Sequence, residues 1–307
     1  MSRAVVFAYH NVGVRCLKVL LAHGVDVALV VTHTDNPSET IWFDSVATTA
    51  ERQGIQVATP LDPNAPETLM RIAALAPDFI FSFYYRQMLK PALLALAKQG
   101  AYNMHGSLLP KYRGRVPINW AVLHGETETG ATLHRMVEKP DAGDIVAQQA
   151  VPILPDDTAG EVFAKVTVAA EMALVGVLPA LLAGTAPHVP QDLAKGSYFG
   201  GRKPEDGCID WLQPAAAIHN LIRAVAPPYP GAFFDIEGHR VIVAGSQRQP
   251  ALRPRGASPK LYIDNDRLLA DCIDGSVLQL TDASVDGKSI LGTQFGARLR
   301  HHSLLLT

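Results

Sequence analysis

The first hundred residues alternate between short apolar runs and segments with helical spacing, and this alternation restricts the fold more than any other feature. Runs of strand length occur at Ala4–Ala8, Val25–Val31, Ile55–Ala58, Asp78–Phe83 and Ala101–His105. Between them, apolar residues recur every three or four positions, as on one face of a helix. Strands that alternate with helices predict a parallel sheet with right-handed crossovers. We therefore expect an α/β domain with a Rossmann-like, doubly wound parallel sheet.

The rest of the chain extends this sheet and then changes character. Thr129–Met136 and Asp144–Pro152 are further strand candidates, and a capping box at Asp157–Glu161 opens a long helix. A segment rich in Gly, Pro and polar residues follows, and then short alternating runs that are typical of β-structure. We expect a catalytic domain at residues 1–188, a linker at 189–204 and a small β-rich, OB-like C-terminal domain at 205–307.

Composition and charge favour a soluble globular protein without a polyanionic partner. Hydrophobic residues make up 48% and charged residues 18% of the 307 residues, which are ordinary values. Residues 1–200 carry 15 Lys/Arg and 18 Asp/Glu, and residues 201–307 carry 12 and 11. Neither part has the excess of Lys and Arg over Asp and Glu that is typical of a protein that binds nucleic acid through its phosphates. We expect no nucleic-acid partner.

The cysteines and the N-terminus favour a cytoplasmic location. Cys16, Cys208 and Cys272 are far apart and lack CxxC spacing, so neither a disulfide framework nor a zinc site is predicted. The N-terminus enters a strand-like run at once, without the apolar segment of a signal peptide. The most apolar stretch, Met172–Ala183, is too short to span a bilayer. We expect no membrane partner.

The histidines outside the segment described below do not predict a metal site. They have no ligand spacing with carboxylates, and they include His10, His33, His134 and the pair His301–His302. The turn after the first strand, Tyr9–Gly13, has one glycine where a dinucleotide-binding fingerprint needs three. A pyrophosphate could therefore not approach this backbone in the usual way, and we expect no NAD(P).

The segment NMHGSLLPKYRGR, Asn103–Arg115, is the most informative part of the sequence. Asn103 and His105 stand two residues apart at the carboxyl end of a predicted strand, so their side chains point to the same face. This edge of an α/β sheet is where such proteins build their sites. Taken alone, the pair also fits a turn-capping asparagine and a buried histidine. Ser107 is a candidate nucleophile beside His105, although the GxSxG motif is absent.

This segment resembles the active-site strand and loop of the 10-formyltetrahydrofolate-dependent formyltransferases. The family shares an Asn, a His two residues later and an Asp in a downstream loop, which here match Asn103, His105 and Asp141. Tyr198–Trp211 and Arg223–Phe233 resemble parts of the C-terminal domain of the same family. The resemblance therefore covers both predicted domains.

Within the family, the closest likeness is to the formyltransferase domain that formylates UDP-4-amino-4-deoxy-L-arabinose in lipid A modification. The matching segments are Val5–Gly13, Thr32–Pro37, Phe81–Arg86, His105–Trp120 and Gly125–Val137. The resemblance implies an N-formyltransferase with 10-formyltetrahydrofolate as cosubstrate and the 4-amino group of a nucleotide-linked sugar as acceptor. The enterobacterial enzyme is fused to a decarboxylating domain that is absent here. A decarboxylase on a separate chain is therefore one candidate partner.

Formyl transfer needs three roles, and the three matched residues suit them. Attack of an amine on a formamide-like carbon develops an oxyanion, which the Asn103 amide can stabilise; one such donor is worth about 2.7–4 kcal/mol. His105 can accept the amine proton and return it to the departing nitrogen. Asp141 can hydrogen-bond the imidazole and stabilise its charged form.

The family pattern also implies a folate site and leaves two other functions open. The residues assigned to the folate are Gln87, Met88, Leu89, Arg115, Val137, Glu138, Lys139 and Pro140. Arg113 and Arg115 suit anionic groups of the donor or acceptor. A methionyl-tRNA formyltransferase is one alternative, and it predicts a basic C-terminal domain. A non-catalytic folate or nucleotide-sugar binding module is the other, but it would not need all three catalytic residues.

Overall fold

The computed structural model describes residues 1–37, 39–236, 238–256, 258–292, 294–295 and 303–306. The chain divides into two compact units. The first comprises Met1–Pro117, Glu128–Val151 and Ala164–Gly200, and the second comprises Ile118–Thr127, Pro152–Phe163 and Gly201–Thr307. Two segments that we assigned from the sequence to the catalytic domain, 118–127 and 152–163, thus belong to the second unit.

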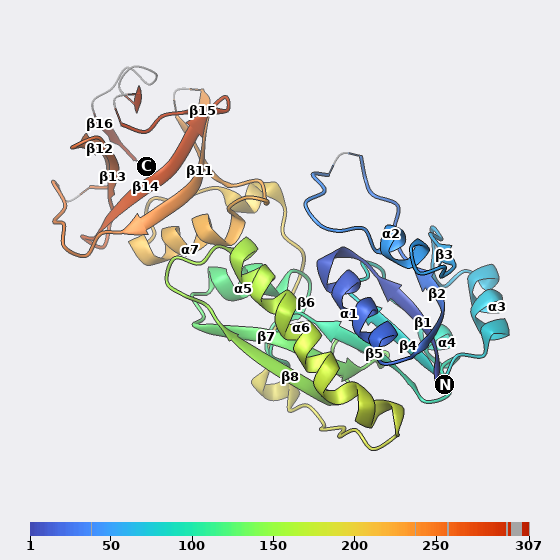
Figure 1. The fold of residues 1–307 in the computed structure, drawn as a ribbon. Helices are drawn as coiled ribbons and strands as arrows, with labels where there is room; N and C mark the ends of the chain where they lie inside the picture. Colours follow the sequence, from blue (N-terminus) through green and yellow to red (C-terminus); the bar gives the residue numbers. More distant parts are fainter. Residues whose placement is uncertain (38, 237, 257, 293, 296–302, 307) are drawn as a thin grey trace. The chain divides into compact units, whose positions relative to one another are not determined.

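The described part of the first unit is built on a seven-stranded sheet with the order β3-β2-β1-β4-β5-β7-β8 (Figure 1). Its strands are β1 (Arg3–Ala8), β2 (Asp26–Val31), β3 (Val57–Ala58), β4 (Phe79–Phe83), β5 (Gly100–His105), β7 (Glu128–Arg135) and β8 (Ile145–Pro152). Strands β1 to β5 pair in parallel, which confirms the predicted α/β sheet with a parallel core.

Strand β7 departs from a wholly parallel sheet. It runs antiparallel to β5, with Asn103 opposite His134 and His105 opposite Thr132. The connection from β5 to β7 gives residues 118–127 to the second unit and places no crossover helix on this sheet. The chain therefore re-enters the sheet in the opposite direction. A short pair, β6 (Arg113–Gly114) and β9 (Tyr198–Phe199), lies parallel in the same unit.

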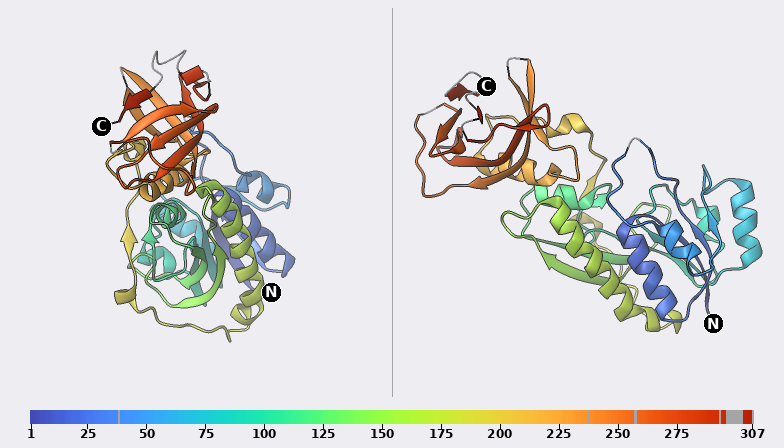
Figure 2. Two further views of the ribbon diagram at one scale, coloured as in Figure 1. Left: turned by 90° about the vertical axis from the view of Figure 1, so that its left-hand side faces the viewer. Right: turned by 45° about the horizontal axis from the view of Figure 1, so that its top comes forward.

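Helices cover both faces of this sheet. They are α1 (His10–Ala22), α2 (Val46–Glu51), α3 (Pro66–Leu75), α4 (Pro91–Leu94) and α6 (Ala159–Leu182). Ile72 of α3 and Leu93 of α4 pack in one core cluster with Phe7 of β1. Helices α1 and α6 lie side by side on the sheet (Figures 1 and 2), joined by a hydrogen bond of 2.6 Å from Arg15 Nε to Glu171 Oε2.

Helix α6 begins at the predicted capping box. The Glu161 N–H lies 3.3 Å from Thr158 Oγ1, and the Glu161 carboxylate accepts the Thr158 N–H at 2.8 Å. Among the described helices, α6 is long and apolar enough to cross a membrane by length and composition. Half of its most apolar window is buried inside the protein, and a core helix passes the same test.

The second unit is an antiparallel β domain, as predicted for the C-terminal part of the chain. Its described strands follow the order β10-β11-β14-β13-β12-β16, with β15 paired to β14. They are β10 (Ala232–Ile236), β11 (His239–Arg248), β12 (Lys260–Asp264), β13 (Arg267–Asp271), β14 (Val277–Val285), β15 (Lys288–Ser289) and β16 (Ser303–Leu305). The helices are α5 (Pro117–Leu123), which begins at the last residue of a first-unit segment, and α7 (Ala215–Val225). A 3₁₀ turn of this unit lies at Pro204–Gly207, and another, at Leu193–Lys195, belongs to the first unit.

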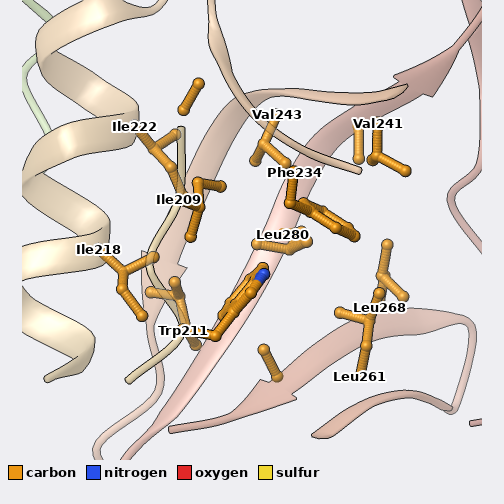
Figure 3. Packing of buried hydrophobic residues seen from close by; sticks show 14 of the residues in the cluster. Ile209, Trp211, Ile218, Ile222, Phe234, Val241, Val243, Leu261, Leu268 and Leu280 are labelled. Atoms are coloured by element: carbon orange, nitrogen blue, oxygen red, sulfur yellow. The ribbon is translucent and has the colours of Figure 1, made fainter. Parts of the chain in front are cut away.

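Large side chains from the helix and the sheet fill the core of this second unit. Trp211 is only 2% exposed, and its ring meets the edge of Phe234 at a centroid distance of 5.3 Å. Ile218 and Ile222 of α7 reach the same cluster (Figure 3). Burial of apolar surface on this scale gives the second unit a core of its own.

Candidate active site

Asn103 and His105 lie at the carboxyl end of β5, on the same face of the strand, as their spacing predicts. His105 is 6% exposed, whereas Asn103 is partly exposed. The strand therefore presents one polar amide and one buried imidazole toward the segment that follows β7.

Asp141 is held firmly in that following segment. Its backbone adopts a left-handed conformation, with φ of 50°. The Gly114 N–H donates to Oδ2 at 2.9 Å, and Gln191 Nε2 donates to the backbone oxygens of Asp141 and Gly143 at 3.0 and 2.6 Å. A Cβ on Gly143 would meet the Arg135 carbonyl at 2.0 Å, so this turn needs glycine. The aspartate loop is thus fixed before any ligand binds.

The His105 imidazole lies between two oxygen acceptors. Its Nε2 is 2.8 Å from the Tyr112 carbonyl, and its Nδ1 is 3.6 Å from Asp141 Oδ1. A carbonyl only accepts, so Nε2 carries a proton and Nδ1 is the nitrogen that gains or loses one. A separation of 3.6 Å is longer than a hydrogen bond, so Asp141 acts on a protonated His105 as an ion-pair partner.

The Asp141 carboxyl stays ionised despite its burial. Burial raises its pKa, but the charge of His105, together with the hydrogen bond from the Gly114 N–H, holds the pKa below its usual range. A permanent negative charge beside His105 Nδ1 favours the imidazolium that forms when the base takes up a proton.

His134 on β7 is a site residue that we did not predict, since we considered it only as a metal ligand. It is 2% exposed, and its Nε2 lies 3.1 Å from Asn103 Nδ2 and 3.4 Å from Asp141 Oδ1. Its Nδ1 lies 2.9 Å from the Arg135 carbonyl, so Nδ1 donates there and Nε2 accepts from the Asn103 amide. One amide N–H of Asn103 is thereby oriented, and the second remains for a ligand.

Ser107 holds the loop that follows β5 in place through hydrogen bonds. Its side chain is fully buried, and its hydroxyl donates to the Lys111 carbonyl at 2.7 Å. Thr132 Oγ1 donates in turn to the Ser107 carbonyl at 2.6 Å. Because its proton is engaged with a backbone oxygen, Ser107 has a structural role, and direct attack by the amine needs no serine nucleophile.

The loops after β4 and β5 approach each other closely beside His105. A Cβ on Gly106 would lie 2.0 Å from the Tyr84 hydroxyl oxygen, and Tyr84 itself has a φ of 57°. A side chain at position 106 would therefore displace the Tyr84 ring, which borders this end of the strand.

His10 and His33 stand among aromatic rings after β1 and β2. His33 stacks on Tyr85 at a centroid distance of 4.1 Å and accepts the Arg86 N–H at 3.0 Å. Burial, together with the charge of Arg86, lowers the pKa of His33 to about 4 and that of His10 to about 3. Both rings are thus neutral at pH 7.

Metal ligation has no candidate within the described residues. In that part of the chain, no group of three His, Cys, Asp or Glu side chains is arranged to hold a metal ion. His301 and His302 lie outside the described residues.

Seven of the eight residues assigned to the folate fall on two surface segments, one after β4 and one after β7. Met88 is 57% and Val137 43% exposed, so both apolar side chains are open to a ligand. Gln87 donates to the Leu61 carbonyl at 2.9 Å. Leu89 is only 7% exposed and packs in the core, so it can meet a ligand only through its backbone.

The remaining assigned residues extend this surface toward Asp141. Glu138 and Lys139 are exposed, and Pro140 is half-buried directly before Asp141. Arg115 is exposed just after β6. Apolar and charged groups thus neighbour the fixed aspartate loop along the chain.

Arg113 is a buried cation whose nitrogens are incompletely bonded. It is 8% exposed, and within the described residues its Nε is buried without a hydrogen-bond partner. Leaving a charged group in this state costs free energy unless an anion compensates it. The arrangement therefore favours an anionic ligand near β6.

Two family models match the chain. A formyl transferase model covers residues 12–178, and a model of the formyl transferase C-terminal domain covers residues 202–299. Together they extend over both units and contain Asn103, His105 and Asp141.

Solved structures share the fold at low sequence identity. An N-formyltransferase from Helicobacter canadensis, in complex with folinic acid and dTDP-3-aminofucose, is 22% identical with a TM-score of 0.74, covering 91% of this chain and 99% of that one. WlaRD, a sugar 3N-formyl transferase studied with dTDP and 5-N-formyl-THF, is 21% identical with a TM-score of 0.69, covering 94% and 99%. A 4-N formyltransferase from Francisella tularensis is 21% identical with a TM-score of 0.64, covering 79% and 96%.

Proposed function

We propose that this chain, which belongs to the formyl transferase family, transfers a formyl group from 10-formyltetrahydrofolate to the amino group of a nucleotide-linked sugar. The observation that carries the proposal is the convergence of Asn103, His105 and Asp141, with His134, around one end of β5. The acceptor that we favour is the 4-amino group of UDP-4-amino-4-deoxy-L-arabinose, on the sequence likeness to that type of enzyme.

The folate supplies the formyl carbon, and the exposed segments described above fit it. A pterin ring is planar with apolar faces, and the open side chains of Met88 and Val137 suit such a surface. The exposed Arg115 and Lys139 suit the carboxylates of a folate tail. Structural relatives bind folinic acid or 5-N-formyl-THF, which supports this assignment.

Asn103 stabilises the charge that develops on the formyl oxygen during attack. One of its amide N–H groups is engaged by His134 Nε2 at 3.1 Å, which fixes the rotation of the amide. The other N–H is then already oriented, so the reaction does not include the free-energy cost of turning it toward the oxyanion.

His105 takes the proton that the attacking amine must lose. Neutral His105 has its lone pair at Nδ1, because Nε2 donates to the Tyr112 carbonyl. Once Nδ1 is protonated, the Asp141 carboxylate at 3.6 Å stabilises the imidazolium. The same proton then returns to the departing folate nitrogen.

The charge of a buried arginine supports the proposal that the acceptor carries a nucleotide. Within the described part of the chain, the buried Nε of Arg113 has no hydrogen-bond partner, and a diphosphate would compensate its charge. Two structural relatives were solved with dTDP or a dTDP-linked amino sugar. A methionyl-tRNA acceptor is less consistent with the chain, because residues 201–307 carry only 12 Lys/Arg against 11 Asp/Glu. A cytoplasmic location completes the proposal.

A comparison of acceptors tests this function. The protein is incubated with 10-formyltetrahydrofolate and either UDP-4-amino-4-deoxy-L-arabinose or methionyl-tRNA, and release of tetrahydrofolate is followed. We expect turnover with the sugar nucleotide. Turnover with tRNA alone would contradict the proposed acceptor while leaving the formyltransferase chemistry in place.

A further inference from the structure

Residues 189–199, which fall in the linker predicted from the sequence, belong to the first unit and contact two of its loops. At one end, the Val189 N–H donates to the Ile145 carbonyl at 2.9 Å, and at the other the Arg115 N–H donates to the Phe199 carbonyl at 3.0 Å. Ile145 begins β8, just after the aspartate loop, and Arg115 follows β6, in the loop after β5. One short segment therefore touches both loops that carry the proposed catalytic residues.

Gln191 holds the backbone of the aspartate loop at two points. Its Nε2 donates to the Asp141 carbonyl at 3.0 Å and to the Gly143 carbonyl at 2.6 Å. The φ of Asp141 is 50°, a left-handed conformation that is uncommon for a residue other than glycine. Gln191 thus supports the backbone from which the carboxylate projects, while the Gly114 N–H holds the carboxylate itself. Together these contacts keep Asp141 Oδ1 at 3.6 Å from His105 Nδ1.

Ser197 holds the two peptide groups on either side of the Tyr112 Cα atom. Its Oγ accepts the Tyr112 N–H at 2.8 Å, and its carbonyl accepts the Arg113 N–H at 3.0 Å. The Arg113 N–H belongs to the same peptide group as the Tyr112 carbonyl, which accepts a hydrogen bond from His105 Nε2 at 2.8 Å. The oxygen that binds the imidazole N–H is therefore fixed by Ser197 as well as by its own loop.

The close approach of residues 189–199 to the loop after β5 depends on Gly196. A Cβ on Gly196 would lie 2.3 Å from the Pro110 carbonyl oxygen. The Ser197 N–H donates to the same oxygen at 3.3 Å, and the Phe199 ring stacks on Tyr112 at a centroid distance of 5.4 Å. A larger residue at position 196 would therefore push Ser197 away from the peptide groups that it holds.

We propose that Gln191 and Ser197 are positioning residues that keep the neutral His105 ring in the tautomer with its lone pair at Nδ1. Ser197 acts through the Tyr112 carbonyl, which accepts the Nε2–H. Gln191 acts through Asp141, which at 3.6 Å can stabilise a charged ring but is too far away to accept a hydrogen bond from Nδ1. If the carboxylate moved closer, it would favour a proton on Nδ1, and the lone pair of the proposed base would be lost. The inference rests on the proposed function, since it needs His105 as the base.

Ring ¹⁵N NMR of histidine-labelled protein measures the tautomer directly and needs no substrate. His105→Ala identifies the signals of His105, and spectra are taken at about pH 9, where an imidazole is neutral. In the wild type the Nε2–H form should predominate. Gln191→Leu and Ser197→Ala should each lower the ratio of the Nε2–H to the Nδ1–H form about fivefold, which is the effect of one ordinary hydrogen bond on an equilibrium.

Matched variants separate this effect from a general loss of structure. Ser197→Thr keeps the hydroxyl and should restore the wild-type ratio. Gln191→Asn keeps an amide with a shorter reach and should give a smaller fall than Gln191→Leu. Gln149→Leu removes another glutamine of the first unit, which donates to the Ala150 carbonyl, and should leave the ratio unchanged. Thermal unfolding establishes that each variant folds.

Turnover with the sugar nucleotide then links the tautomer to the reaction. Release of tetrahydrofolate should show a kcat about tenfold lower in Gln191→Leu, with KM little changed, because the base is misplaced while the substrates still bind. In the Asp141→Asn background, Gln191→Leu should lower kcat little further, since Gln191 acts through that carboxylate. A fall by the same factor in both backgrounds would mean that Gln191 does not act through Asp141.

The outcomes separate this inference from the proposed function. If Gln191→Leu and Ser197→Ala both fold and keep the wild-type tautomer ratio, the inference is wrong, and formyl transfer to the sugar nucleotide could still be observed. If the ratio falls but the wild type formylates no amino sugar nucleotide, the positioning stands and the acceptor is wrong. If the ratio falls while kcat stays unchanged, His105 is not the base, and the positioning has no part in the reaction.

Discussion

The end of β5 and a pocket of the second unit, lined by residues that include Trp120, Arg202 and Gln213, differ in how their charged side chains are held. At β5, the carboxylate of Asp141 is already bonded by Gly114 and faced by two imidazoles, and its loop is held by Gln191. In the pocket, the Nε atom of Arg202 is buried without a hydrogen-bond partner among the described residues. A site that performs chemistry benefits from groups fixed in advance. Substitutions at the end of β5 should therefore lower kcat more than they change KM.

The largest effect is expected for His105→Ala, which removes the proposed base. We expect kcat to fall by about 10²–10⁴-fold, the usual contribution of general acid–base catalysis, with KM little changed. Steady-state release of tetrahydrofolate measures it, and thermal unfolding confirms the fold. If the variant keeps most of its activity, His105 is not the base, and the end of β5 does not perform the chemistry that we assign to it.

Asn103→Ala should have the next largest effect. Loss of one oxyanion donor typically lowers kcat by about 10²–10³-fold. The amide does not hold the ground-state acceptor, so KM should stay close to the wild-type value. If the loss appears in KM alone, Asn103 binds substrate and does not stabilise the developing charge.

His134→Ala should lower kcat by about tenfold, the scale of one ordinary hydrogen bond that orients another group. His134→Gln should recover part of the loss, because its side-chain oxygen can accept from Asn103. Equal activity of both variants and the wild type would mean that the 3.1 Å contact does not position the amide.

The smallest predicted effect concerns stability and pH. The folded-state pKa of Asp141 is held below its usual range, so its contribution to stability is present above the unfolded value of about 3.9 and is lost as pH falls through the folded value. Asp141→Asn should therefore lose less unfolding free energy than the wild type between pH 5 and acid, about pH 2. Urea titrations measure this, with Asp144→Asn as the neighbouring control. If Asp141→Asn and the wild type lose equal amounts of unfolding free energy over this pH range, the pairing of Asp141 with His105 does not stabilise the fold.

The two regions also differ in how far the sequence predicted them. The alternation of strands and helices predicted the parallel core, and the two-residue spacing placed Asn103 and His105 on one face of β5. His134 was not predicted as a site residue, because its place opposite Asn103 depends on the antiparallel pairing of β7. The direction in which a strand pairs depends on the tertiary structure, and no local pattern in residues 128–135 indicates it.

The pocket of the second unit was harder to predict from the sequence than the end of β5. Trp120 comes from α5, whereas Arg202 and Gln213 come from a segment far along the chain. We had placed residues 118–127 with the catalytic domain, so nothing indicated that Trp120 would meet Arg202. The contact arises from the folding of two separated segments into one unit.

The most direct test of the central claim follows the transferred carbon itself. In a single turnover with ¹³C-labelled 10-formyltetrahydrofolate and UDP-4-amino-4-deoxy-L-arabinose, the label should appear as a formamide on the sugar nucleotide, detected by NMR. Label recovered only as free formate, or left on the folate, would contradict the assignment of Asn103, His105 and Asp141 to formyl transfer onto a nucleotide-linked amine.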